Sequence, residues 1–322
     1  MPELIAGFDA GQTHTRCRLA DARSGAILSE GGGPGVCHLA SSGGAEAFRQ
    51  ALVASLAQAR SALGPGRQGS LLAAAVGASG IEVGSPVQRQ GRQLAAAALG
   101  LPPQRTAVTG DERTALRGAM GTACEGLVLI SGTGTIALGR NRHGQEHRCA
   151  GWGWLLDGAG SAMDIGRDGL SASLEMADGR RPETPLRQRL WQALELDCQD
   201  PAAAAAIKAR VVQPDFGAAG FAALAPPVIA EAEAGDTTAL AIVRHNAGAL
   251  AGMAAAISRL LNLEQPPVWP MGVALHHLPL LRRELTLARA ARLPSAQLAE
   301  PAADAFTGAL SLARELLPAG RP

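Results

Sequence analysis

The stretch LIAGFDAGQTHTRCRLA, residues 4–20, decides the fold of this chain. Its short apolar run ends at Phe8 and leads into Asp9 and Gly11, after which β-type residues resume through Leu19. This pattern predicts a β-hairpin with an acid at its tip.

An aspartate at the end of a buried strand, followed by a glycine turn, can bind a metal ion and phosphate groups together. The N–H groups of the turn and the hydroxyls of Thr13 and Thr15 can hold a polyphosphate beside a hydrated divalent cation. Nucleotide binding is therefore the first hypothesis for this hairpin. The alternative is an ordinary hairpin with a solvated Asp-Ala-Gly turn.

Composition favours a globular chain with two domains. The 322 residues, 47% of them hydrophobic, are enough for two well-buried cores. The 29 basic residues nearly balance the 28 acidic ones, and no basic residues cluster, so nothing suggests binding to nucleic acid or to a membrane surface.

Cysteine usage and the N-terminal sequence favour a cytoplasmic protein. The 5 cysteines are odd in number and form no CxxC pair, which argues against a disulfide framework or a structural zinc site. The chain starts a strand within a few residues and lacks a charged leader with an apolar core. No run approaches the ~20 apolar residues that a membrane span needs.

Two further predicted strands are each followed, at the carboxyl end, by residues that can contact a ligand. An apolar strand over 71–76 ends at Gly77-Ala78-Ser79-Gly80, where open α/β sheets place ligand groups, so Ser79 and Gly80 are candidate ligand contacts. A second strand over 105–108 ends in Thr109-Gly110-Asp111. A helix is expected directly after it, so Asp111 is a candidate site acid or, alternatively, a plain helix N-cap.

The design of the first hairpin recurs in the second half of the chain. An apolar strand over 127–130 is followed by the glycine-threonine turn Ser131-Gly132-Thr133-Gly134-Thr135 and a returning strand over 136–139. Two such turns about one domain apart suggest a duplicated fold that holds one phosphate chain from both sides. The pattern lacks the Gly-x-x-x-x-Gly-Lys-Ser/Thr spacing, so it is not a Walker-type loop.

The remaining chain predicts helices, separated by Gly, Pro or Asp breaks, that cover the second sheet. Their expected ranges are 161–176, 185–194, 201–211, 217–234 and 237–263. Trp152 and Trp154, which precede them, are expected to pack against the interdomain core, with sugar stacking as the alternative.

Five motifs, in order, resemble those of the BadF/BadG/BcrA/BcrD-type ATPase and N-acetylglucosamine kinase family, a branch of the actin-like ATPase and sugar kinase superfamily. They are residues 7–15, Gly110-Asp111, residues 130–139, residues 150–156 and Met271-Gly272-Val273. The resemblance covers essentially the whole chain. It implies an α/β fold of two ribonuclease-H-like (actin-like ATPase) domains, each with a mixed five-stranded sheet flanked by helices, and an interdomain cleft.

The resemblance also implies domain bounds. Residues 1–115 plus 303–322 form the first domain, which is discontinuous because the last helix returns to it, and which carries the first phosphate loop and the catalytic aspartate. Residues 116–302 form the second domain, with the second phosphate loop and the adenosine site.

By the resemblance, Asp9 organises Mg²⁺, and Asp111 is the general base that takes the proton of the attacking sugar hydroxyl. The expected ATP-binding residues are Gly11, Thr13, Thr15, Gly132, Thr133, Gly134, Thr135, Gly272 and Val273. The expected substrate-binding residues are Ser79, Gly80, Asp111 and Asp157.

The departures from the family pattern affect the residues expected to bind the sugar more than those expected to bind the nucleotide. Where the family typically reads Leu-Gly-Asp-Glu-Gly-Ser, this chain has Asp157-Gly158-Ala159 in the middle, so an aspartate associated with sugar recognition is displaced or lost. Ile136 and Cys37 stand where the mammalian-type kinases carry asparagines. Fewer amide partners imply lower selectivity for N-acetylglucosamine.

These expectations define an ATP-dependent kinase of a small sugar, an amino sugar such as N-acetylglucosamine or glucosamine, with ATP and Mg²⁺ as cofactors. A homodimer is expected at the family level. One alternative is an ATPase of the kind that activates dehydratases and reductases, which holds an iron–sulfur cluster through cysteines. Another is a catalytically inactive sugar or nucleotide sensor.

Overall fold

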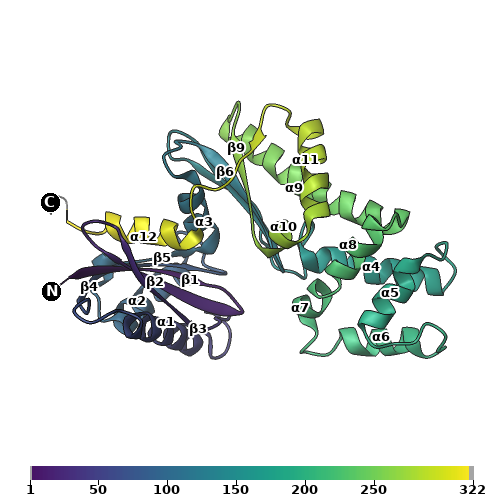
Figure 1. Cartoon of the computed structure of the whole chain (residues 1–322), viewed down its shortest axis with the longest axis horizontal. Coiled ribbons are helices and arrows are strands. Elements are labelled where there is room, and N and C mark those ends of the chain that lie inside the picture. Colours follow the sequence, from purple (N-terminus) through teal and green to yellow (C-terminus); the bar gives the residue numbers. More distant parts are fainter. Residues whose placement is uncertain (1, 319–322) are drawn as a thin grey trace. The chain divides into compact units, whose positions relative to one another are not determined.

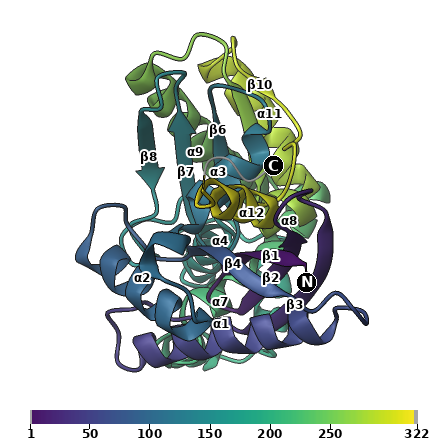
Figure 2. The same ribbon diagram turned by 90° about the vertical axis from the view of Figure 1, so that its left-hand side faces the viewer.

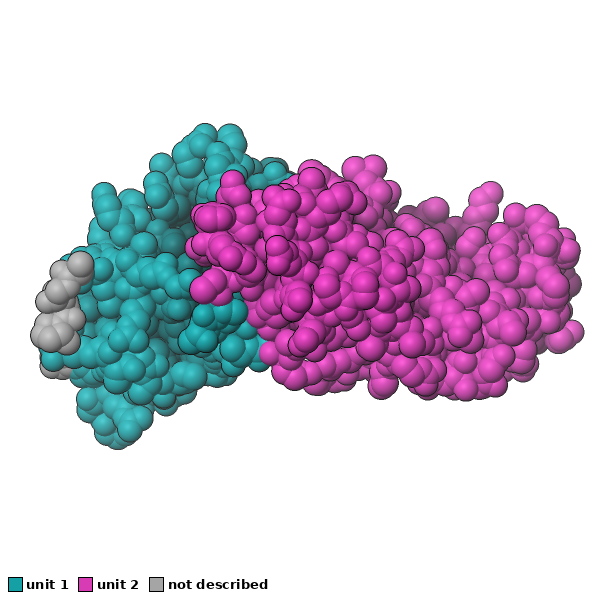
Figure 3. Space-filling model, turned by 90° about the horizontal axis from the view of Figure 1, so that it is seen from above, with its two compact units in different colours: residues 1–123, 301–322 teal, residues 124–300 magenta. Residues whose placement is uncertain are grey.

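The computed structural model describes residues 2–318, which divide into two compact units. Residues 1–123 together with 301–322 form unit 1, and residues 124–300 form unit 2 (Figure 3). The expected division after residue 115 falls inside helix α3 (Asp111–Met120), which packs along α12 (Ala305–Glu315) of the same unit. The boundary therefore lies after the helix rather than within it. The last residues of the expected range 303–322, from 319 on, lie outside the described residues.

Unit 1 is built on a mixed five-stranded sheet in the order β3-β2-β1-β4-β5 (Figure 1). β1 pairs antiparallel with β2, and β2 with β3, whereas β1, β4 and β5 run parallel. Its strands are β1 (Glu3–Ala10), β2 (His14–Asp21), β3 (Ile27–Pro34), β4 (Ser70–Ala78) and β5 (Thr106–Gly110). Its remaining helices are α1 (Gly44–Ser61), α2 (Pro86–Leu99) and the 3₁₀ turn η1 (Pro103–Arg105).

Helices cover both faces of this sheet. Side chains of successive strand residues point to opposite faces, so β1 contributes Phe8 to the core under α1 and Ile5 to the core under α12. Gly7 lies where α12 crosses β1: a Cβ there would stand 2.8 Å from the backbone of Leu310 and of Phe306. The glycine therefore allows the C-terminal helix to lie directly on the strand that ends at Asp9.

The start of α12 is tied to the sheet by an arginine. Arg18 on β2 donates to both carboxylate oxygens of Asp304 at 2.8 Å and to Glu30 at 2.7 Å. Asp304 is also the N-cap of α12 and accepts from the N–H of Thr307 at 2.9 Å. Partial burial raises the pKa of Asp304, but the bonds from Arg18 and Thr307 outweigh it and hold that pKa below its ordinary value.

Asp304→Asn should lower the free energy of unfolding at neutral pH by about 0.5–1 kcal/mol, since a partly exposed ion pair is lost while asparagine still caps the helix. Because the folded pKa lies below the unfolded value of 3.8, this stabilisation is complete above that value and disappears as the pH falls through the folded pKa. Urea unfolding of both proteins should therefore differ near pH 7 and converge at strongly acidic pH. Asp178→Asn, at an exposed pair with Arg180, is the matched control with no expected change. A difference that persists undiminished in acid would contradict this account.

Unit 2 repeats the sheet topology of unit 1. Its order, β10-β9-β6-β7-β8, has the same parallel and antiparallel pairs as β5-β4-β1-β2-β3, and β6, β7 and β8 run side by side in Figure 2. The duplication expected from the two hairpins is confirmed. Its strands are β6 (Gly126–Ser131), β7 (Thr135–Arg140), β8 (Glu146–Ala150), β9 (Pro267–Met271) and β10 (Gln297–Leu298).

The helices of unit 2 form a large layer beside its sheet. They are α4 (Ala162–Ala177), α5 (Pro185–Ala193), α6 (Ala203–Val211), α7 (Gly217–Ala222), α8 (Ala225–Glu233), α9 (Thr237–Leu261), α10 (Val273–His277) and α11 (Pro279–Arg292). Among the described residues, α9 alone is long and apolar enough, by length and composition, to cross a membrane. Val243, Leu250 and Ile257 of this helix lie fully buried in the core of unit 2, which is the position of an ordinary core helix.

Candidate active site

Three strands of unit 1 bring their carboxyl ends to one edge of the sheet. In the register of β1, β4 and β5, Asp9 stands beside Gly77, and Gly77 beside Thr109. Asp9, Ser79 and Asp111 therefore emerge at the same edge, as the sequence led us to expect for the ends of parallel strands. The N–H of Ser79 also donates to the carbonyl of Ala10 at 3.3 Å.

Asp9 is three-quarters buried and has an arginine partner. Its side chain is 24% exposed, and Arg16 Nη2 lies 3.3 Å from its Oδ2. Burial raises the pKa of Asp9, the charge and hydrogen bond of Arg16 oppose that rise, and the charge of Asp304 adds to it. The guanidinium of Arg16 lies 4.3 Å from the ring centroid of Phe306 on α12. The acid at the tip of the hairpin is thus held against an arginine that the sequence did not point to.

Asp111 is the first residue of α3, and Gly110 takes the N-cap position without a side chain to cap it. The plain N-cap alternative therefore does not describe Asp111. Burial, the neighbouring carboxylate of Glu112 and the charge of Asp9 raise the pKa of Asp111 to about 7. A carboxyl with a pKa near neutrality is suited to exchange a proton during a reaction.

The acids at this edge fit a divalent cation. Asp9 and Asp111 both have raised pKa values and each is affected by neighbouring negative charge, which a cation would offset. No three His, Cys, Asp or Glu side chains of residues 2–318 converge on one point as metal ligands. A cation held by these acids would take the rest of its coordination from water and phosphate oxygens.

The first glycine turn is short and open. Gly11 donates to the carbonyl of His14 at 3.1 Å and accepts from the N–H of Val36 at 3.0 Å. Thr13 is exposed at the turn, whereas Thr15 lies on β2 with its side chain fully buried. The hydroxyl of Thr15 has no hydrogen-bond partner among the described residues.

Gly80 follows Ser79 in a left-handed conformation, with φ of +77°. A Cβ at this position would lie 2.8 Å from the imidazole of His38. The loop after β3 therefore comes close to the end of β4 and places His38 there. No sequence motif pointed to His38, because its place beside Gly80 depends on contact between separate segments, and none pointed to the burial of Glu112.

The second turn repeats the arrangement of the first. Thr133 is exposed, Thr135 is buried and its hydroxyl donates to the carbonyl of Gly158 at 3.4 Å. Within the turn, Gly132 N–H donates to the carbonyl of Gly134 at 2.9 Å. A Cβ at Gly132 or Gly134 would meet no atom within 4 Å, so the backbone at both glycines is open to a ligand.

The predicted adenosine motif touches this turn. Gly272, between β9 and α10, has φ of +94°, and a Cβ there would lie 2.3 Å from the carbonyl oxygen of Ser131. Val273, the first residue of α10, is 68% exposed. Gly272 therefore joins the phosphate turn directly, and the two predicted nucleotide motifs of unit 2 form one surface.

The segment after β8 turns outward. Trp152 is 63% exposed and stacks under Arg148, whose guanidinium carbon lies 4.5 Å from the ring centroid. Trp154 is 39% exposed, so neither tryptophan is buried in the core of unit 2, and their packing against an interdomain core stays a prediction. The reason is local: Ala150, Gly151 and Gly153 have φ of +64°, +78° and +90°, which turns the chain away from the sheet.

Asp157 ends this outward segment and is partly buried. Its N–H donates to the carbonyl of Gly153 at 2.9 Å, which closes a compact turn. Gly158, the next residue, accepts from Thr135 of the second phosphate turn. The expected substrate-binding acid, Asp157, therefore directly precedes a residue that is hydrogen-bonded to the second glycine turn.

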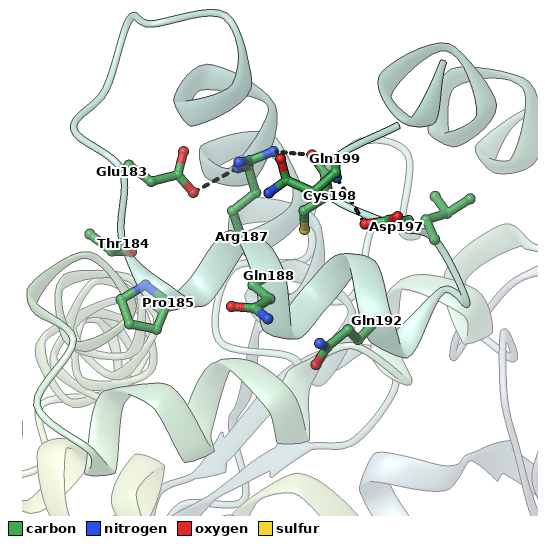
Figure 4. Close-up of a pocket in the computed structure, with 10 residues that line it drawn as sticks. Glu183, Thr184, Pro185, Arg187, Gln188, Gln192, Asp197, Cys198 and Gln199 are labelled. Carbon is green, nitrogen blue, oxygen red and sulfur yellow. Dashed lines mark hydrogen bonds and ion pairs between the residues drawn. The ribbon is translucent and has the colours of Figure 1, made fainter. Parts of the chain in front are cut away.

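A cavity of about 550 Å³ lies elsewhere in unit 2, beside α5 (Figure 4). Arg187 lies in it and donates to Glu183 at 2.7 Å and to the carbonyl of Cys198 at 3.4 Å. None of the candidate site residues lines this cavity. The cavity is therefore separate from the site residues predicted from the sequence.

Comparison with known proteins gives consistent findings. A family profile described as the BadF/BadG/BcrA/BcrD ATPase family matches residues 6–313. An N-acetyl-D-glucosamine kinase of Dictyostelium discoideum is 33% identical over 146 residues, which are 45% of this chain and 44% of that protein. An N-acetylmuramic acid/N-acetylglucosamine kinase of Clostridium acetobutylicum is 38% identical over 89 residues, 28% of this chain and 29% of that protein. The chain thus matches less than half the length of each of these curated relatives.

A solved structure resembles the whole chain. It is that of a Chromobacterium violaceum protein provisionally named N-acetylglucosamine kinase, with 27% identity and a TM-score of 0.73. The likeness covers 96% of this chain and 98% of that one. Together with the duplicated sheets, it confirms the predicted fold of two ribonuclease-H-like α/β domains.

Proposed function

Because the chain belongs to the BadF/BadG/BcrA/BcrD ATPase family, we propose that it is an ATP-dependent kinase that phosphorylates a hydroxyl of a small sugar. The observation that carries this proposal is Asp111, a carboxyl with a pKa raised to about 7 that stands at the same sheet edge as Asp9. A base and a metal-binding acid at one edge are what transfer of a phosphoryl group to a hydroxyl requires.

In this mechanism Asp111 accepts the proton of the sugar hydroxyl as that oxygen attacks the γ-phosphorus, and the bond from the γ-phosphorus to the β-phosphate oxygen breaks so that ADP leaves. Its raised pKa favours holding the proton once it has been taken. Asp9 would hold Mg²⁺, with Asp111 beside it, and the ion would neutralise phosphate charge.

The glycine turns position the nucleotide. In unit 1, the backbone at Gly11 and the exposed hydroxyl of Thr13 are the proposed phosphate contacts. In unit 2, they are the open backbone at Gly132 and Gly134 and the exposed hydroxyl of Thr133. Gly272 and Val273 form the proposed adenosine surface, and the contact of Gly272 with Ser131 holds that surface beside the phosphates.

We propose an amino sugar, N-acetylglucosamine or glucosamine, as the acceptor. The names of the curated relatives support this, as does the likeness to the Chromobacterium violaceum protein. Ser79, Gly80 and Asp157 are the proposed sugar contacts, and His38 beside Gly80 joins them. The balanced charge and the cysteines favour a cytoplasmic protein, and we propose a homodimer, which sedimentation of the purified chain can test.

The direct test is ADP release from Mg·ATP by the purified protein, alone and with a panel of sugars. The panel contains glucosamine, N-acetylglucosamine, N-acetylmannosamine, N-acetylmuramic acid and glucose. We expect one amino sugar to stimulate release by at least tenfold, and chelation of the metal to abolish it. Release that no sugar stimulates would contradict the kinase and favour an ATPase or a sensor.

A further inference from the structure

A buried amide on α9 reaches the loop behind the second phosphate turn. Asn246 is fully buried, and its Oδ1 accepts from the N–H of Gly160 at 2.7 Å. Its Nδ2 donates to the carbonyl of Ile242 at 3.1 Å and to Asp168 Oδ2 at 3.4 Å. Both sides of the amide are therefore used, which fixes the orientation in which its oxygen faces Gly160.

Gly160 is held from a second side by the phosphate turn itself. Its carbonyl accepts from Ser131 Oγ at 2.6 Å, and Ser131 is the residue that immediately precedes Gly132 of the turn. Two residues after Gly160, the N–H of Ala162 donates to the carbonyl of Gly132 at 2.9 Å. With the bond from Thr135 to the carbonyl of Gly158, the loop is thus bonded to the turn at three points and to α9 at one.

Gly160 cannot hold this position by its own backbone preference. Its φ is +94°, and glycine adopts positive and negative φ about equally readily, so the backbone of Gly160 alone does not favour this conformation over others. The glycine N–H would also be an unpaired buried donor without Asn246, at a cost that shifting the loop would relieve. Such a shift would carry Ser131 and Gly132 with it.

We propose that Asn246 is a positioning residue, which holds the second phosphate turn in the conformation that binds the nucleotide. The inference rests on the proposed function, because it takes the turn from Gly132 to Thr135 as the phosphate site. It adds a residue that none of the sequence motifs contains. Asn246 acts through Gly160 and Ser131 and touches no ligand itself.

The test compares two substitutions of Asn246 that differ in whether the side chain can still accept the hydrogen bond from the N–H of Gly160. Asn246→Leu removes the acceptor for Gly160, whereas Asn246→Asp keeps an acceptor but places a second carboxylate beside Asp168. We expect both variants to lose stability. Asn246→Leu should weaken Mg·ADP binding about tenfold, and Asn246→Asp should bind within about twofold of the wild type. Ser258→Ala, which removes a buried bond to Ala254 within the same helix, is the control with unchanged affinity.

The measurements are calorimetric titration with Mg·ADP and thermal unfolding of each protein. Affinity that simply follows stability, so that both Asn246 variants bind equally weakly, would show a purely structural role and overturn the inference. Wild-type affinity in Asn246→Leu would overturn it as well. If Asn246→Leu does not fold, Asn246→Asp decides: near-normal binding at reduced stability supports the inference, and weak binding overturns it. A wild-type protein that binds no Mg·ADP would instead refute the proposed function, and the positioning role with it.

Discussion

Asp111→Asn should lower kcat for sugar phosphorylation by about 10³-fold or more, while the affinity for Mg·ATP changes by no more than about twofold. An amide has nearly the shape of the carboxyl but cannot take the hydroxyl proton. Asp111 lies at the end of β5 and begins α3, so the substitution leaves the backbone of both elements intact. The loss should therefore appear in the chemical step and not in nucleotide binding.

Steady-state kinetics with the stimulating sugar, together with calorimetric titration of the nucleotide, measure the two effects separately. Asp9→Asn is the informative comparison, because it should raise the concentration of Mg²⁺ needed for half-maximal activity. Retention of full turnover by Asp111→Asn would refute its role as the general base, and a parallel loss of nucleotide affinity would assign it to binding.

The same assignment predicts a pH dependence of kcat/KM. Burial and the charges of Glu112 and Asp9 raise the pKa of Asp111 to about 7, and a base works only when it has lost its proton. Activity should therefore fall as the pH drops through the pKa of Asp111, and a cation at Asp9 moves that midpoint lower. A profile that Asp111→Asn leaves unchanged in its acidic limb would contradict this assignment.

Gly272→Ala should strongly destabilise unit 2 and weaken nucleotide binding. The added Cβ would lie 2.3 Å from the carbonyl oxygen and 2.9 Å from the nitrogen of Ser131, and the φ of +94° is strained for alanine. Because both contacts are with backbone, they cannot be relieved by a side-chain rotation. We expect a loss of about 2–4 kcal/mol in the free energy of unfolding, and nucleotide binding reduced by more than tenfold because the phosphate turn is displaced.

Gly248→Ala, in the middle of α9, is the matched control. Its Cβ would come no closer than 3.7 Å to Arg292, so it should be neutral or should stabilise unit 2 by about 0.5–1 kcal/mol through helix propensity. Urea unfolding and Mg·ADP titration of both variants make the comparison. Wild-type stability in Gly272→Ala would show that the two turns are not packed against each other as described.

Local sequence signals located most elements but not all of their limits. The strand expected over 71–76 is β4 (Ser70–Ala78), because a continuous apolar run with glycines after it is a local signal. The single helix expected over 217–234 is instead α7 and α8, separated at Ala223 and Leu224. Pro226 and Pro227 account for the break, since proline is accepted in the first turn of a helix and not in its interior.

By itself the sequence determined the duplicated fold and the positions of both glycine turns, of Asp9 and of Asp111. These features follow from short-range patterns: apolar strands, the glycines after them and the acids at their ends. Which residues these groups contact was decided only by the tertiary structure. Arg16 faces Asp9, Gly272 meets Ser131, and Asn246 bonds to Gly160 across 86 residues of chain. The raised pKa of Asp111 is partly of the same kind, because its burial and the charge of Asp9 arise only when distant segments pack together, whereas Glu112 is its neighbour in the chain.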